Sequence, residues 1–166
     1  MHTIAETQQF IIRNFEPEEE EIYLALFDDP EVTLHLPKRN RAENVALFHT
    51  ALADYEFGNT LGRWGIFNPA DQELIGICLL RYFNGHIAQI ELGYVLAKKY
   101  WGKGLASAMA KILVDYCFKH VNTQEIVAVT TLTNTGSQNV LLKAGLKRVD
   151  NLVKDGQELA YFRLGR

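Results

Sequence analysis

The chain has 166 residues, 48% of them hydrophobic, and a net charge of −3, which suits one globular domain and argues against a nucleic-acid binder with its usual basic stripe. The five histidines are scattered, and Cys78 and Cys117 form no CxxC pair, so the sequence predicts no metal site and two reduced core thiols. No apolar run is long enough to cross a bilayer, and we expect a cytoplasmic protein with no membrane or nucleic-acid partner.

The first half of the chain predicts a strand, two helices and the start of a sheet. The run Glu16 to Glu21 is typical of a helix start, because Pro17 fits the first helical position and acidic residues complement the helix dipole. A sharper alternative is an acidic patch that recruits a basic substrate. The expected elements are a strand over residues 10–15, a helix from 16 that stops at 28–30, a helix over 41–55, and strands over 63–67 and 74–82. The sequence of residues 31–37 does not favour either a helix or a strand.

Two dipeptides, Asn84-Gly85 and Asp155-Gly156, predict β-hairpins in the second half. The first leads into a strand over residues 87–96, and the second joins strands over 146–153 and 158–164. Between them we expect a helix over 105–119 with an apolar stripe, a short strand over 126–131 and a helix over 137–144 that Gly145 ends. This order predicts an α/β (α+β) fold with a mixed, mostly antiparallel central sheet of about six to seven strands flanked by helices.

The segment from Lys98 to Ala106 is the most informative part of the chain. It reads KKYWGKGLA and lies between an apolar strand and a helix start. Glycines at Gly102 and Gly104 let the backbone approach a ligand closely, and the first N–H groups of a helix have no internal partner. The pattern therefore favours an anion cradle for phosphate, to which Lys103 could add charge. The alternative is a tight turn that binds nothing.

Three blocks of sequence, in the same order and spacing, resemble the GNAT superfamily of acyl-CoA-dependent N-acetyltransferases. They are ELIG at 73–76, IELGYVL at 90–96 continuing into YWGKGLA at 100–106, and NTGS at 134–137 followed by VL at 140–141 and KAGL at 143–146. The branch that acetylates the N-termini of ribosomal proteins is the most similar. The resemblance covers nearly the whole chain and implies a single acetyltransferase domain over residues 1–166.

The resemblance also implies acetyl-CoA as co-substrate and names the residues that bind it. The family's loop pattern is Gln/Arg-x-x-Gly-x-Gly/Ala, and here Lys99 stands at its first position. The strand end at Val95 and Leu96 would pair with the pantetheine amides, Asn134 would contact the cofactor near the thioester, and Ser137 would lie beside the pantetheine arm. Asn134 and Ser137 could equally form a helix N-cap. The main-chain N–H groups that would bind the pyrophosphate belong to Trp101, Gly102, Lys103, Gly104, Leu105 and Ala106.

Glu91 is the candidate catalytic base, because a glutamate in a central strand is rare unless it is exposed or functional. An ion pair that merely places its side chain is the alternative. Many relatives carry a tyrosine as general acid in the short helix after Asn134, and the matching residue here is Leu141, which cannot donate a proton. We therefore expect Ser137, a water or no dedicated acid at this step. We also expect direct transfer without a cysteine intermediate, because Cys78 and Cys117 lie on apolar patterns without a nearby base in the sequence.

The predicted function is transfer of an acetyl group from acetyl-CoA to a primary amine, either a protein N-terminal α-amine or a small amine. The alternative is a non-catalytic acyl-CoA-binding or interaction module on the same fold. In the family the variable N-terminal half borders the acceptor, which here means residues 37–41 and 55–62. A homodimer is possible.

Overall fold

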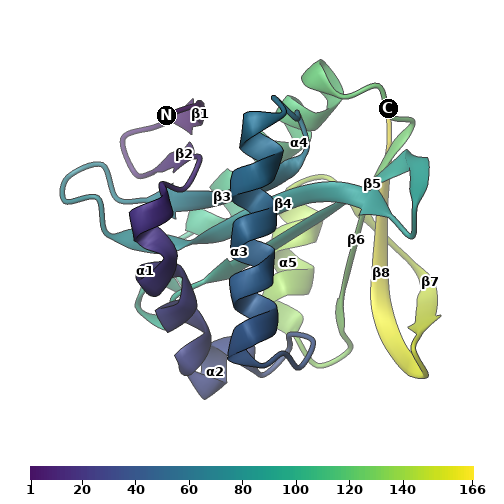
Figure 1. The fold of residues 1–166 in the computed structure, drawn as a ribbon. Helices are drawn as coiled ribbons and strands as arrows, with labels where there is room; N and C mark the ends of the chain where they lie inside the picture. The colour runs from purple at the N-terminus through teal and green to yellow at the C-terminus, as the bar shows by residue number, and fades with distance from the viewer. The chain divides into compact units, whose positions relative to one another are not determined.

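The computed structural model describes residues Met1 to Arg166. An eight-stranded sheet has the strand order β1-β2-β3-β4-β5-β6-β8-β7 (Figure 1). The strands are β1 (Thr3–Glu6), β2 (Ile11–Arg13), β3 (Gly62–Phe67), β4 (Leu74–Phe83), β5 (His86–Leu96), β6 (Glu125–Thr131), β7 (Lys147–Lys154) and β8 (Gln157–Gly165). The helices are α1 (Glu20–Ala25), α2 (Pro30–Thr33), α3 (Arg41–Glu56), α4 (Leu105–His120) and α5 (Thr135–Lys143), with 3-10 turns at Pro17–Glu19, Leu26–Asp28 and Lys98–Tyr100.

The mixed, mostly antiparallel sheet confirms the predicted fold class. Its additional strand, β1, has four residues with no buried side chain and pairs with β2 at one edge. A strand this short carries no alternating pattern, so the sequence does not reveal it. The chain forms two compact units, one from Met1–Leu79 with Tyr94–Lys103 and one from Leu80–Gly93 with Gly104–Arg166.

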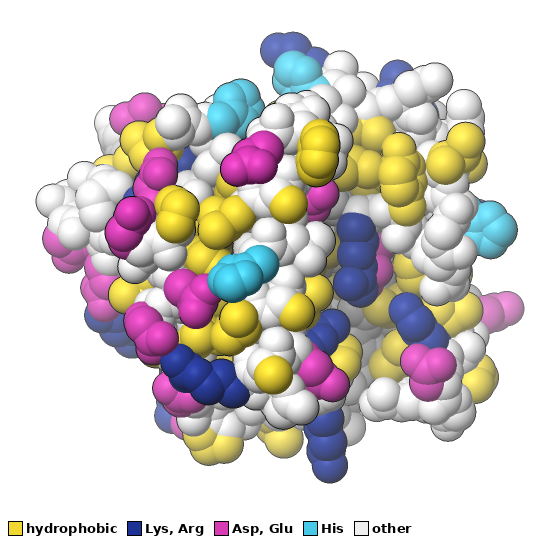
Figure 2. Space-filling model, in the orientation of Figure 1, with side chains coloured by type: hydrophobic (Ala, Val, Ile, Leu, Met, Phe, Trp, Pro, Cys, Tyr) yellow, Lys and Arg dark blue, Asp and Glu magenta, His cyan; other side chains and the backbone are white.

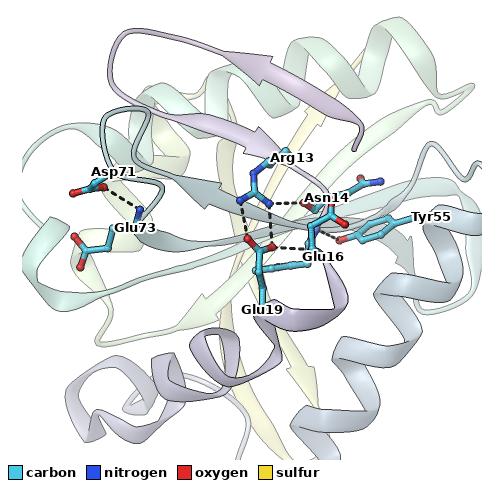
Figure 3. Close-up of polar contacts among 8 residues, drawn as sticks. Arg13, Asn14, Glu16, Glu19, Tyr55, Asp71 and Glu73 are labelled. Atoms are coloured by element: carbon cyan, nitrogen blue, oxygen red, sulfur yellow. Dashed lines mark hydrogen bonds and ion pairs between the residues drawn. The ribbon is translucent and has the colours of Figure 1, made fainter.

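In the first unit an ion pair fixes the start of the first helix. The carboxylate of Glu19 accepts the backbone N–H of Glu16 at 2.8 Å, and Arg13 Nη2 donates to it at 2.8 Å (Figure 3). Arg13 is only 4% exposed, and its guanidinium lies 3.5 Å from the ring centroid of Phe67. Figure 2 shows other acidic side chains on the face of α1 and α3, where Glu20 contacts His49 and Glu21 contacts Arg41. These contacts favour the helix-start interpretation of the acidic run.

An aromatic cluster forms the core of this unit. The rings of Phe15, Tyr23, Phe48 and Phe67 are at most 2% exposed, and neighbouring centroids lie 5.1–5.7 Å apart. Helix α3 supplies Phe48 as its apolar pattern predicts, while the pattern gives no sign that Asn44 is buried with it. The start of residues 31–37, for which the sequence predicted no secondary structure, belongs to the short helix α2. The side chain of Asp29 caps this helix by accepting the N–H of Glu31 at 2.9 Å.

The second unit is built on parallel and antiparallel strand pairs. The parallel register of β5 and β6 runs from Gln89–Glu125 to Glu91–Val127, and β8 pairs antiparallel with both β6 and β7. The predicted hairpin turns are confirmed, because Asn84, Gly85, Asp155 and Gly156 all have positive φ angles between 49° and 76°. Helix α4 buries most of its predicted stripe, with Leu105, Met109, Leu113 and Cys117 in the core. None of the helices is both long and apolar enough to span a membrane.

Candidate active site

Ion pairs anchor the approach to the glycine loop. Lys98 pairs with Glu31, and Lys99 pairs with Glu73, which also accepts the hydroxyl of Tyr100 at 2.7 Å. The hydrogen bonds from Lys99 and Tyr100 hold the pKa of Glu73 below its ordinary value. The lysine at the first position of the loop pattern therefore has a carboxylate partner within the protein, and its role here is to hold the loop.

The strand end before the loop is fixed by its backbone. The indole Nε1 of Trp101 donates to the Leu96 carbonyl at 2.9 Å, and the N–H of Ala97 donates to Ile75 at 2.9 Å. Because backbone groups alternate along a strand, those of Leu96 point away from β4. The Leu96 carbonyl has a second lone pair, so it and the Leu96 N–H are the groups at this strand end that can pair with a ligand.

The start of α4 has no side-chain cap, a feature that it shares with the six-residue helix α1. Side chains cap α2, α3 and α5, whereas no side chain accepts a hydrogen bond from the first turn of α4. The first helical bond runs from Ala108 to the Gly104 carbonyl at 3.1 Å, so the N–H groups of Leu105, Ala106 and Ser107 have no helical partner. Donors of this kind at the positive end of a 16-residue helix suit an anion.

The two loop glycines have the conformation that this geometry requires. Their φ angles are +70° at Gly102 and +77° at Gly104, a left-handed region that other residues avoid. A Cβ atom at either position would project into open space. Residues in this conformation within a turn orient successive N–H groups toward an anion. Lys103 lies between them, with its Nζ 5.5 Å from the Tyr100 ring centroid.

Asn134 is the N-cap of α5. Its Oδ1 accepts the N–H of Ser137 at 3.2 Å, so the capping interpretation is confirmed and the helix starts at Thr135, two residues earlier than predicted. Both side chains are half-buried. The bond uses Oδ1, and the amide nitrogen of Asn134 remains as a donor. Leu141 is 2% exposed and packs in the core, so the family's tyrosine position serves packing in this chain.

Glu91 is a buried carboxylate in an ion pair. It is 8% exposed, and Arg81 Nε on β4 donates to its Oε2 at 2.7 Å. The flanking residues Ile90 and Leu92 are at most 2% exposed, as the alternation of the strand predicts. The sequence analysis missed Arg81, although a charged residue near the end of a predicted apolar strand is a signal of the same kind as Glu91 itself.

The cysteines are unsuited to covalent catalysis. Both are buried, and burial raises the pKa of Cys117 to about 11 and that of Cys78 further. A thiol with so high a pKa is protonated and weakly nucleophilic at neutral pH. Direct transfer without a cysteine intermediate therefore stays a prediction.

Comparison with known proteins identifies the family. The family model described as acetyltransferase (GNAT) domain matches residues 9–147. The chain belongs to the GNAT acetyltransferase family. A Bacillus subtilis relative named uncharacterized N-acetyltransferase YoaA is 28% identical over 151 residues, which span 89% of this chain and 85% of the relative. Family and relatives favour an N-acetyltransferase over a non-catalytic module.

Two solved structures share the fold of this GNAT acetyltransferase. The ribosomal-protein-S5-alanine acetyltransferase from Vibrio fischeri has a TM-score of 0.83 at 18% identity, covering 99% of this chain and 97% of that one. Spermidine N-acetyltransferase from Vibrio cholerae, in complex with CoA and spermine, has a TM-score of 0.77 at 19% identity, covering 96% of each chain. At sequence identities this low, the similarity shows only that the fold is shared.

Proposed function

We propose that this GNAT enzyme transfers the acetyl group of acetyl-CoA directly to a primary amine, and that residues 1–166 act as one acetyltransferase domain. The observation that carries the proposal is the start of α4, where two left-handed glycines precede a helix with no side-chain cap. Three N–H groups without a helical partner at a helix N-terminus fit a pyrophosphate. The family match over residues 9–147 supports the same co-substrate.

The cofactor residues divide into a phosphate group and a pantetheine group. Residues 101–106 (Trp101, Gly102, Lys103, Gly104, Leu105 and Ala106) would bind the pyrophosphate through main-chain N–H groups. Val95 and Leu96 would pair with the pantetheine. The outward direction of the Leu96 backbone supports this pairing, whereas the Val95 carbonyl faces Gly76 on β4. Asn134 would contact the cofactor near its thioester through its amide nitrogen, and Ser137 would lie beside the pantetheine arm.

Bound acetyl-CoA supplies an acetyl group activated as a thioester. Glu91 would take a proton from the acceptor ammonium, directly or through a water, and leave a neutral amine as nucleophile. The N–H of Leu96 would stabilise the negative charge that develops on the carbonyl oxygen. A C–N bond replaces the C–S bond, and the attacking nitrogen gives up its second proton to solvent as the amide forms. The thiolate leaves without a dedicated acid because thiols ionise at a pKa of about 8.5.

The acceptor class is either a protein N-terminal α-amine or a small amine. The Vibrio fischeri and Vibrio cholerae structures carry the names of one enzyme of each kind on this fold. Because Glu91 lies in the strand that leads to the glycine loop, the proposed base and the proposed cofactor loop belong to one continuous segment, residues 91–106. The same chemistry would serve either class of acceptor.

Paired glycine variants test the phosphate assignment. Gly104→Ala places a Cβ beside the first N–H groups of α4, and we expect it to weaken CoA binding at least about tenfold in calorimetry. Gly156→Ala is the matched control, because Gly156 has a φ of +76° and equally open space around its Cβ position. Both variants bear a similar backbone strain of about 1–2 kcal/mol, so thermal melts should match. Equal CoA affinity in the two folded variants would remove the phosphate assignment.

A further inference from the structure

Two arginine–glutamate pairs lie on the same face of the sheet in the second unit. Arg81 on β4 pairs with Glu91 on β5, and Arg163 on β8 pairs with Glu125 on β6. Gln89, two residues before Glu91 on β5, stands opposite Glu125 and donates to it at 2.7 Å, so both glutamates point to one side of the sheet. Both arginine side chains are 46% exposed, and those of the glutamates are 10% and 16% exposed. The surroundings of the two pairs are similar, and their hydrogen bonds can be compared directly.

The pair between β6 and β8 uses both oxygens of its carboxylate. Oε1 of Glu125 accepts from Arg163 Nε at 2.6 Å, and Oε2 accepts from Arg163 Nη2 at 2.9 Å and from Gln89 at 2.7 Å. A bidentate arrangement of this kind is frequent between arginine and a carboxylate. The hydrogen bonds of this pair are therefore completed within the protein.

The pair of Arg81 and Glu91 is open by comparison. Its single hydrogen bond runs from Arg81 Nε to Glu91 Oε2 at 2.7 Å, and neither Nη group of Arg81 has a partner in the protein. Oε1 of Glu91 has no partner either, but it is not fully sealed from solvent. The carboxylate thus has one oxygen fixed and one oxygen accessible, which is the arrangement that a base needs in order to accept a proton.

We propose that Arg81 is a positioning residue that holds Glu91 for proton transfer. This proposal rests on the acetyltransferase function proposed above, in which Glu91 is the base. A glutamate side chain has several rotatable bonds, and the charge-assisted hydrogen bond from Nε selects the arrangement in which Oε2 is held against β4 and Oε1 is left to react. The guanidinium also provides the opposite charge that a buried carboxylate requires.

The proton transfer itself involves only one of the two side chains. Oε1 of Glu91 takes a proton from the acceptor ammonium, directly or through a water, so that an O–H bond forms and an N–H bond breaks. The electron pair of that bond stays on the nitrogen for attack on the thioester, and later loss of the proton to solvent restores the carboxylate. Arg81 keeps its charge throughout. It therefore acts through Glu91 and not on the acceptor.

A double-mutant cycle between Arg81 and Glu91 tests this role. We measure kcat with the amine that is acetylated fastest among a peptide with an N-terminal alanine, spermidine and glucosamine. Arg81→Gln should lower kcat about tenfold or more, because the base is misplaced, and leave KM for acetyl-CoA unchanged. In the Glu91→Gln background the same substitution should change kcat less than about twofold, because the group that it positions is already lost. Arg81→Lys places its ammonium one bond beyond the position of Nε and should keep most of the kcat.

Arg163→Gln is the matched control, because it breaks the closed pair on the same face of the sheet. In thermal melts it should lose at least as much stability as Arg81→Gln, since it removes more hydrogen bonds, yet its kcat should stay near the wild-type value. Equal losses of kcat in the two variants would make Arg81 a structural residue. An Arg81→Gln loss that multiplies with that of Glu91→Gln would mean that Arg81 acts on the acceptor. Either result overturns the proposal.

Failure of the proposed function gives different results. Absent CoA binding in calorimetry, or no acetylation of any of the three amines, would contradict the acetyltransferase function, and this proposal with it. An undiminished kcat in Glu91→Gln would remove Glu91 as the base and leave Arg81 nothing to position. Normal CoA binding together with a kcat that depends on Glu91 but not on Arg81 would overturn the role of Arg81 alone.

Discussion

At the scale of single residues, two side chains combine a structural contact with a proposed chemical role. Glu91 is held by Arg81 at 2.7 Å, and Asn134 caps α5 through a 3.2 Å bond. Either contact alone would explain the residue's position. To separate the two roles, a variant must keep the structural contact, or it must be compared with a control variant that loses a similar contact at another position.

Glu91→Gln tests the base. It keeps the size of the side chain and its ability to accept a hydrogen bond from Arg81, but it cannot take a proton. We expect kcat to fall about 10²-fold or more, while calorimetry shows little change in CoA affinity. Glu125→Gln is the matched control, because Glu125 is also a strand carboxylate in an ion pair, with Arg163 at 2.6 Å. A similar small effect of both substitutions on kcat would make Glu91 a structural residue.

Asn134→Asp tests the cofactor contact. Aspartate caps helices about as well as asparagine, so the free energy of unfolding should stay within about 1 kcal/mol. The substitution removes the amide donor and adds negative charge, and kcat/KM for acetyl-CoA should fall clearly. The reciprocal substitution Asp29→Asn at the N-cap of α2 is the control, because it exchanges the same two residue types at a helix N-cap outside the proposed cofactor site. Reduced stability with unchanged kinetics per folded molecule would leave capping as the only role of Asn134.

At the scale of elements, the contact between β4 and the end of β5 depends on a glycine. A Cβ atom at Gly76 would overlap the Val95 carbonyl and lie 2.9 Å from Leu96 Cα. Both are backbone atoms, so relief requires the strands to separate. The strand end that we propose for pantetheine binding is thus positioned by a residue on its neighbour.

Gly76→Ala should destabilise the protein by about 1–3 kcal/mol, as overpacking of a tight interior does. Gly136→Ala on α5 is the control, because its nearest neighbour would be 3.9 Å away and alanine favours a helix over glycine by about 1 kcal/mol. Urea unfolding of both variants measures the difference. A loss at Gly76 no greater than that at Gly136 would contradict the close approach of the two strands.

At the scale of the whole molecule, the stability should depend on a carboxylate that links three strands. Glu125 on β6 contacts Arg163 on β8 and Gln89 on β5, at 2.6 Å and 2.7 Å. The hydrogen bond from Arg163 is the larger cause that holds the pKa of Glu125 below its ordinary value of 4.5. A carboxylate whose pKa is lower in the folded state than in the unfolded state stabilises the folded protein at pH values above the unfolded pKa. That contribution to the free energy of unfolding is lost as the pH falls through the folded pKa.

The expected result is a difference in acid stability between the wild type and Glu125→Gln. The wild type should be more stable at pH 7, and the two unfolding free energies should converge as the pH falls below about 4. Urea titrations between pH 7 and pH 3 measure both curves. A constant difference across that range would show that the ion pair contributes nothing through ionisation.

The sequence by itself determined the features that depend on neighbouring residues. Asn84-Gly85 and Asp155-Gly156 adopt the positive φ angles of their turns, the stripe of α4 is buried, and Gly104 stands in the left-handed conformation before a helix. These features follow from local backbone sterics and from the direction of side chains, which repeats every 2 residues in a strand and every 3.6 in a helix. Both repeats are visible in the hydrophobic pattern of the sequence. The family resemblance rested on the same local blocks.

Only the tertiary structure decided which side chains meet. Arg81 reaches Glu91, the carbonyl of Val95 faces Gly76, and the Tyr55 hydroxyl donates to the Arg63 carbonyl. Such partners depend on strand register and helix packing, and a shift of one residue in register would turn each strand side chain to the opposite face. The sequence therefore predicted the fold and the glycine loop, whereas the partner of the candidate base and the close approach of β4 to the end of β5 required the folded chain.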